Sequence, residues 1–209
     1  MLRRSQEDRS RETRKVLEQA GRRLFTEHGF AAVSAEEIVA AAGVTRGALN
    51  YQYGDKRGLF LAVLDRLEQD NAAEIEAALA TAPQPTDLLG TMTLGLGLFL
   101  KICQRPEMAQ IGLSDAPSVL GWQAWREFEA RHGLALITAQ LEAAVAGGLV
   151  LGARIPVLAQ LLLSAVTEAG MMVANAADQD TARAEAEEAL LVLIKGILAP
   201  AGEPSGAAG

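Results

Sequence analysis

The sequence predicts an all-α protein, and three observations support that fold class. Ala, Leu and Glu are abundant, and aromatic residues make up only 4% of the 209 positions, a composition that favours helices. Apolar residues recur at three- and four-residue spacing along most of the chain. Capping residues precede these apolar runs, and Gly or Pro follows them. We therefore expect a series of amphipathic helices packed around apolar cores.

The first helix is expected to run from about Ser10 to His28 and to end at Gly29. Its inward face should carry Val16, Ala20, Leu24 and Phe25. Residues 1–9 hold three arginines among polar residues (Arg3, Arg4 and Arg9). They are expected to form a disordered arm that lies against phosphates or, equally, a tail without a role.

Two short helices joined by a tight turn are predicted within residues 34–56. Ser34 followed by Glu37 is a capping-box pattern, in which each side chain accepts a hydrogen bond from the other residue's amide. This helix should stop at Gly43, where a left-handed C-terminal residue is favoured. Thr45 is a candidate N-cap for the second helix. All three helices should enclose a small core made of Val16, Leu24, Phe25, Phe30, Val33, Ile38, Val39, Val44, Leu49 and Tyr53.

The outward face of the second short helix is polar and open to close approach. It carries a guanidinium, a glycine, an amide and a phenol (Arg46, Gly47, Asn50 and Tyr51). These groups can contact the phosphates and base edges of DNA, and a helix-turn-helix presents its second helix in this way. A solvated surface helix is the alternative interpretation.

A long helix is predicted next, from Lys56 to about Ala80. Asp55 should cap its start, and Pro83 and Pro85 should mark its end because neither ring can continue the backbone hydrogen bonding. The remaining chain should form four more helices, at Leu88–Cys103, Pro117–Val150, Ile155–Ala174 and Thr181–Leu198.

The last two of these helices have apolar faces wider than one neighbouring helix can cover, which predicts self-association. A glycine-rich turn should precede them (Gly147, Gly148 and Gly152). Residues 200–209 are rich in Gly, Pro and Ala and should be disordered.

A small-molecule pocket is one interpretation of the Met and aromatic residues in the C-terminal part, because such side chains suit an adaptable site. The alternative is an ordinary core. Glu168 interrupts the apolar run of its helix, so we expect either a polar pocket residue or a charge paired at a seam between subunits. The candidate pocket residues are Leu96, Phe99, Cys103, Met108, Trp122, Trp125, Phe128, Glu168, Met171 and Met172.

The formal net charge of −7 is unevenly distributed along the chain. Residues 1–60 hold 11 Lys and Arg against 8 Asp and Glu, a charge of +3, whereas residues 61–209 carry −10. A basic N-terminal part is where a polyanion would dock. The N-terminus lacks the apolar core of a secretory signal, and the longest uncharged runs are too short to span a membrane. We expect a cytoplasmic protein that has no membrane partner.

No catalytic or metal centre is predicted, and no cofactor is expected. His28 and His132 are the only histidines, and neither has Cys or His at zinc-ligand spacing. His28 should interact with the carbonyls of a helix end, and His132 should be solvated or line a pocket. Cys103, the single cysteine, lies in an apolar run where a thiol is usually buried and inert.

The segment from Thr13 to Phe60 resembles the N-terminal DNA-binding domain of the tetracycline-repressor (TetR) family of bacterial transcriptional regulators. The resemblance rests on the run LFTEHGF, the turn IVAAAGV, the GAL opening of the second short helix and the DK start of the long helix. It implies phosphate contacts for Ser34, Thr45, Tyr51 and Lys56, and base-edge positions for Arg46, Gly47 and Asn50.

Two positions depart from the family pattern. Members usually carry Tyr where Asn50 stands and His where Gln52 stands. This departure puts the phosphate contact of that tyrosine in doubt, and Asn50 is a candidate to read an adenine edge through its amide.

The resemblance further implies a homodimer held by two C-terminal helices of each subunit, with a small-molecule pocket in the same part of the chain. We expect a helix-turn-helix domain with its arm at residues 1–56, an effector-binding and dimerisation domain at 57–199, and a tail at 200–209. The expected function is a repressor that a small, largely apolar ligand releases from a palindromic operator. Two alternatives stay open: an effector-independent regulator whose C-terminal part is only a dimerisation scaffold, and a helical ligand carrier without DNA activity.

Overall fold

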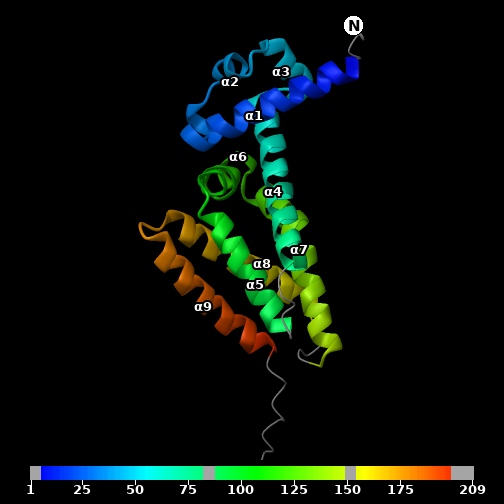
Figure 1. Ribbon diagram of the computed structural model, residues 1–209, viewed down its shortest axis with the longest axis vertical. Helices are drawn as coiled ribbons and strands as arrows, with labels where there is room; N and C mark the ends of the chain where they lie inside the picture. The colour runs from blue at the N-terminus through cyan, green and yellow to red at the C-terminus, as the bar shows by residue number, and fades with distance from the viewer. Residues whose placement is uncertain (1–5, 82–87, 149–153, 199–209) are drawn as a thin grey trace, which may run out of the picture. The chain divides into compact units, whose positions relative to one another are not determined.

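The computed structural model describes residues 6–81, 88–148 and 154–198, and every regular element within these ranges is a helix (Figure 1). The prediction of an all-α fold is confirmed for this part of the chain. The chain divides into two compact units: unit 1 comprises Met1–Asn71 and Arg105–Trp122, and unit 2 comprises Ala72–Gln104 and Gln123–Gly209. Unit 1 continues past residue 56 because later segments pack with the N-terminal helices.

Unit 1 is built on three N-terminal helices and the first part of a fourth. Its elements are α1 (Gln6–Ala32), α2 (Ala35–Ala42), α3 (Arg46–Tyr53), the start of α4 (Lys56–Thr81), the π-helical segment η1 (Met108–Asp115) and α6 (Ala116–Leu120). The rings of Phe25, Phe30 and Phe60 meet pairwise at centroid distances of 5.1 to 5.8 Å. The buried apolar side chains of unit 1 include Leu17, Phe25, Val33, Ile38, Leu49, Leu59, Phe60, Val63, Leu64 and Leu67.

The start and the inward face of α1 differ from the prediction. The helix begins at Gln6, so Arg9 lies on a helix and not in a disordered arm, while residues 1–5 lie outside the described part. Leu17 and Gly21 are buried, whereas Val16 and Leu24 are only partly so. The reason is the neighbouring helix: α4 brings Leu59 so close that a Cβ on Gly21 would lie 3.2 Å from its side chain.

Glycines at positive φ interrupt two helical stretches. Gly29 (φ 76°, ψ 161°) kinks α1 near its end, in a backbone conformation that is essentially restricted to glycine. Gly121 (φ 81°, ψ 157°) separates α6 from α7 (Trp122–Ala146). The prediction of one continuous helix from Pro117 to Val150 is therefore wrong, because a single glycine within an apolar run was not recognised as a break.

Residues 105–122 are attached to α1 and α4 by polar contacts. Arg22 of α1 donates through Nε and Nη2 to Glu107, at 2.7 and 2.8 Å, and through Nη1 to Asp70 of α4, at 2.8 Å. At the other end of the segment, the Phe30 amide donates to the Asp115 carboxylate at 2.7 Å. These contacts explain why the segment belongs to unit 1.

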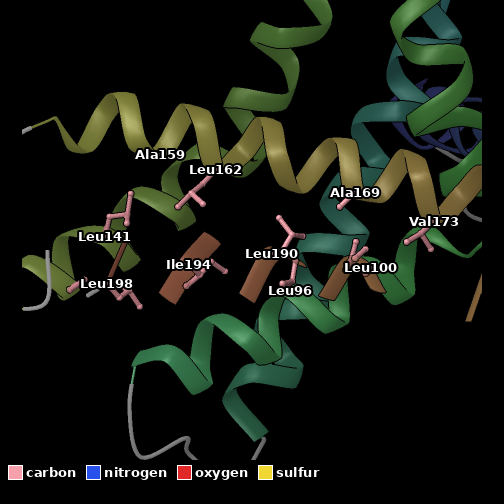
Figure 2. Packing of buried hydrophobic residues seen from close by; sticks show 12 residues of the cluster. Leu96, Leu100, Leu141, Ala159, Leu162, Ala169, Val173, Leu190, Ile194 and Leu198 are labelled. Carbon is pink, nitrogen blue, oxygen red and sulfur yellow. The ribbon is translucent and has the colours of Figure 1, made fainter. Parts of the chain in front are cut away.

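Unit 2 packs four helices around one apolar cluster. Besides α7 and the end of α4, it contains α5 (Leu88–Cys103), α8 (Ile155–Asn175) and α9 (Gln179–Leu198), close to the predicted bounds. Figure 2 shows side chains of α9 between those of α5 and α8. The cluster comprises Leu96, Leu100, Leu141, Ala144, Ala159, Leu162, Ala169, Val173, Ala186, Leu190, Ile194 and Leu198. The predictions for Pro83, Pro85, Gly152 and residues 200–209 concern positions outside the described residues.

Helix α8 is long and apolar enough to cross a membrane, judged by length and composition alone. Within the described part of the chain, 39% of its most apolar window is buried. Its buried side packs in the cluster of unit 2. Its other side leaves large apolar side chains exposed (Val157, Leu161 and Met172), and α9 does the same with Val192 and Leu193. The two helices therefore carry more apolar surface than one chain covers.

Candidate nucleic-acid interface

Helix α2 begins and ends as its capping residues predict. The Glu37 amide donates to Ser34 Oγ at 3.2 Å, and the Ser34 amide donates to Glu37 Oε2 at 2.7 Å, which completes the capping box. The hydrogen bonds from the Ser34 backbone and hydroxyl hold the pKa of Glu37 below its ordinary value. Gly43 closes the helix in the left-handed conformation (φ 65°, ψ 31°). The start of α3 is thereby fixed relative to α2.

Helix α3 presents the predicted outward residues. The Ala48 amide donates to Thr45 Oγ1 at 3.2 Å, which confirms the predicted N-cap, and Leu49 is fully buried beneath the helix. Tyr51 is 79% exposed. The same face leaves Thr45, Arg46, Gly47 and Asn50 open to solvent. Two hydroxyls, an amide and a guanidinium thus lie on the exposed side of one helix.

Polar contacts tie the inner side of α3 to α1. Gln52 Nε2 donates to Ser10 Oγ at 2.8 Å, and Gln52 Oε1 accepts from Arg14 Nε at 2.7 Å. Tyr53 donates to Glu18 at 2.7 Å, and burial together with this hydrogen bond raises its pKa. The glutamine that departs from the family pattern therefore acts as a bridge between two helices. Sequence reasoning missed this bridge because its partners lie about 40 positions away.

Lys56, a predicted phosphate contact, is held inside unit 1. Its ammonium donates to the carbonyls of Phe30 and Val33, at 2.8 and 2.7 Å, and lies 4.1 Å from the centroid of the Phe30 ring. The lysine thus secures the connection between α1 and α2. One of its three donors stays available, so its phosphate contact remains a prediction.

Arg46 forms an ion pair with Glu36 of α2, although both side chains are exposed. The pair links the second residue of α2 to the first residue of α3. The sequence-based reasoning placed Arg46 outward but did not assign it this partner, since the two residues belong to different helices.

The candidate pocket residues are divided between the two units. Met108 and Trp122 belong to unit 1, where Met108 is buried and Trp122 is 72% exposed, and the other eight belong to unit 2. In unit 2, Leu96, Cys103, Trp125 and Phe128 are buried, Phe99 and Met171 are partly buried, and Glu168 and Met172 are exposed. Helices α5 and α8 bring two of the candidates close to Gly170: a Cβ on Gly170 would lie 2.8 Å from Cys103 Sγ and 3.2 Å from the Phe99 ring.

A polar group between α7 and α8 was not predicted. Arg126 donates to Glu129, at 3.0 Å, and to Ser164 Oγ, at 2.7 Å, and Glu129 is also hydrogen-bonded to the buried Thr167. Burial raises the pKa of Glu129, against the opposing effects of Thr167 and Arg126. Arg126 and Glu129 have the spacing of an ordinary surface pair, so only the fold reveals that they are covered.

Two family models match the chain. The model described as bacterial regulatory proteins of the tetR family matches residues 18–63, and the model described as tetracyclin repressor-like, C-terminal domain, matches residues 90–197. The HTH-type transcriptional regulator AcrR of Shigella flexneri is 39% identical over 67 residues, 32% of this chain and 31% of that protein. The HTH-type transcriptional repressor AcnR of Corynebacterium glutamicum is 35% identical over 68 residues, 32% and 36% of the two chains. The chain thus spans about a third of the length of these curated relatives.

Solved structures match nearly the whole chain. A TetR-family transcriptional regulator from Pectobacterium atrosepticum has a TM-score of 0.77 at 29% identity, covering 93% of this chain and 98% of that one. RolR, solved in complex with the ligand resorcinol, has a TM-score of 0.66 at 16% identity, covering 90% of each chain. The second likeness concerns the fold alone.

Proposed function

This chain belongs to the TetR family of DNA-binding transcriptional regulators, which are not enzymes, and we propose that it is a repressor that a small, largely apolar ligand releases from a palindromic operator. The observation that carries the proposal is the solvent-facing polar surface of α3, held rigidly by the α2 cap and the Gln52 bridge. A cytoplasmic location follows from the proposed encounter with chromosomal DNA.

Helix α3 enters the major groove in this proposal. Arg46, Gly47 and Asn50 lie at or near base edges, where the guanidinium suits guanine and the amide suits adenine. Thr45 and Tyr51 contact phosphates, and Ser34 does so at the start of α2. Lys56 supports them chiefly by fixing the α1–α2 connection, with one donor left for a phosphate.

The homodimer forms through α8 and α9. Val157, Leu161 and Met172 lie on one side of α8, and Val192 and Leu193 add exposed apolar surface on α9 for a second copy to cover. Glu168 lies on the same outward side of α8 and would be a charge at the seam. Two helices from each subunit make a four-helix bundle. A dimer then places its recognition helices about 34 Å apart, one turn of duplex, which requires a palindromic operator.

The effector binds in unit 2. Support comes from its buried aromatic and sulfur side chains, such as Phe99, Cys103 and Phe128, and from RolR, a protein of the same fold that was solved with resorcinol. Glu168 and Met172 are further candidate contacts in this unit. Release requires that the ligand bind one conformer more tightly than the other, and we propose that α4 transmits the difference because it runs through both units.

A footprint on the DNA flanking the gene for this protein tests the proposal directly. The purified full-length protein should protect two half-sites about 10 base pairs apart, on one face of the duplex. Raising the salt concentration from 50 to 200 mM should weaken binding steeply. Each phosphate that the protein contacts releases counterions and adds about −0.9 to the slope of log K against log[salt]. A single protected half-site would contradict the dimeric operator complex, and salt-independent binding would contradict a phosphate-based interface. Tight binding of a ligand without any change in operator affinity would contradict release.

A further inference from the structure

The ion pair between Glu36 and Arg46 places a carboxylate on the surface that is proposed to face DNA. Glu36 is the second residue of α2, and Arg46 is the first residue of α3. The side chains are 73% and 50% exposed, respectively, so solvent reaches both partners in the free protein. A carboxylate is an unusual neighbour for a polyanion, because it accepts hydrogen bonds and repels phosphates.

We propose that Glu36 is a specificity-determining residue that acts through Arg46 and restricts this arginine to guanine-containing sites. The inference rests on the proposed function, in which α3 enters the major groove. Glu36 belongs to the preceding helix, so it adds a second element to the reading surface.

The chemistry of base edges explains the restriction. Arg46 has five N–H donors, so it can keep one hydrogen bond to Glu36 while it donates two to O6 and N7 of guanine. A cytosine N4 amino group would supply a donor to the free oxygen of Glu36. A G·C-containing step thus satisfies both partners of the pair.

Other sites satisfy only part of the pair. Where Arg46 meets phosphates alone, Glu36 still competes for the guanidinium and repels the same phosphates. At an A·T pair the adenine N6 amino group can still donate to Glu36, but Arg46 does not find the O6 and N7 acceptor pair of guanine, so only the carboxylate is satisfied. Glu36 should therefore weaken non-specific binding more than specific binding.

A purely structural role for Glu36 makes a different prediction. A carboxylate in the first turn of α2 also interacts favourably with the N-terminal end of the helix dipole. In that case, its removal would lower the stability of unit 1 and weaken all DNA binding equally. Thermal unfolding of each variant and the conservative E36Q change separate the two roles.

The test uses full-length protein and two duplexes. A library of randomised duplexes is first selected with the wild-type protein, and the selected duplex and a scrambled duplex then serve as probes in equilibrium binding by fluorescence anisotropy. The variants are E36A, E36Q, R46A and the double variant E36A/R46A. E27A is the matched control, because Glu27 is an exposed acid of α1 that pairs with Arg23 at 3.3 Å. It removes the same charge from unit 1 outside α2 and α3.

The expected result for E36A is a higher affinity for the scrambled duplex and a weaker preference for the selected duplex. E36A should bind the scrambled duplex about 3- to 10-fold more tightly, with a salt slope steeper by about 0.9 because Arg46 becomes free for one phosphate. Its ratio of selected to scrambled affinity should fall by about the same 3- to 10-fold, because Arg46 can still donate to guanine in the selected duplex. E36Q should also bind the scrambled duplex more tightly than the wild type, since the negative charge is gone. E27A should leave the ratio unchanged.

The double variant shows whether Glu36 acts through Arg46. Once Arg46 is absent, the further E36A change should leave the affinity ratio where R46A alone puts it. An unchanged ratio in E36A, in protein that unfolds at the wild-type temperature, would overturn the inference. The same holds if E36A lowers both affinities equally. If the wild-type protein selects no duplex at all, the proposed function fails and the role of Glu36 fails with it.

Discussion

Replacing Arg22 with alanine should destabilise the protein more than an ordinary surface substitution. Arg22 makes three hydrogen bonds of 2.7 to 2.8 Å to carboxylates of Asp70 and Glu107. Each hydrogen bond to a charged group contributes about 1.5–3 kcal/mol when well covered. The three side chains are 28% to 38% exposed, so solvent screens part of this gain. We expect a net cost of about 2–3 kcal/mol.

Thermal unfolding at fixed protein concentration measures this cost. For a chain of this length, the midpoint should fall by roughly 5–10 °C. R23A is the matched control, since the adjacent Arg23 forms only an exposed i,i+4 pair with Glu27 at 3.3 Å. That pair should contribute less than about 0.5 kcal/mol. R22K should fall between the two, because a lysine cannot reproduce the bidentate contact with Glu107.

Equal losses in R22A and R23A would refute the reasoning, since they would mean that the network around Arg22 is worth no more than a solvated pair. A double-mutant cycle between R22A and E107Q gives a second reading. The two changes should be strongly non-additive, because either one removes the same bidentate contact. If the losses of stability in R22A and E107Q were additive, the contact between Arg22 and Glu107 would not be the source of the stabilisation.

Three further predictions concern backbone strain, titration and assembly. G29A should cost about 1–3 kcal/mol in urea unfolding, because its φ of 76° and ψ of 161° suit only glycine, whereas G95A, a helical position with open space around its Cβ, should stabilise by up to about 1 kcal/mol. Burial raises the pKa of Glu129, so its charged form lowers the stability of the folded protein, and stability should decline as pH rises above the ordinary pKa of 4.5. E129Q should flatten this decline in a pH series of urea midpoints. L161D should give monomers in analytical ultracentrifugation and weaken operator binding, whereas L136D, which alters an exposed leucine of α7, should stay dimeric.

Local signals in the sequence were sufficient to predict most helices. The Ser34–Glu37 capping box, the Thr45 cap and the glycine at position 43 each act within three or four residues, and all three are present as predicted. The bounds of α5 and α8 follow from long apolar runs in the same way. Such features depend on neighbours in the chain, so a single sequence contains the information.

Contacts between distant residues could not be predicted from the pattern. Leu17 and Gly21 face inward because α4 presents Leu59 to them, a fact that the periodicity of α1 alone does not fix within one residue. The partner of Arg46 lies on another helix, and the partners of Gln52 lie about 40 positions away. In the candidate site, the sequence therefore indicated which groups face outward but not which of them are already paired.

The attachment of residues 105–122 to α1 constrains how a signal can reach the recognition helix. This segment lies within the match to the C-terminal family domain, yet it packs in unit 1 through Arg22 and Asp115. To move independently of α1, the segment would have to break these hydrogen bonds at a cost of several kcal/mol. A complete switch between two conformers requires about 5.5 kcal/mol of differential ligand affinity. Breaking these hydrogen bonds would therefore use up much of the free energy that the ligand can supply. Movement of α1 together with the segment is the cheaper response. If the proposed ligand-induced dissociation from the operator uses this movement, R22A should weaken the effect of the ligand more than it weakens operator binding.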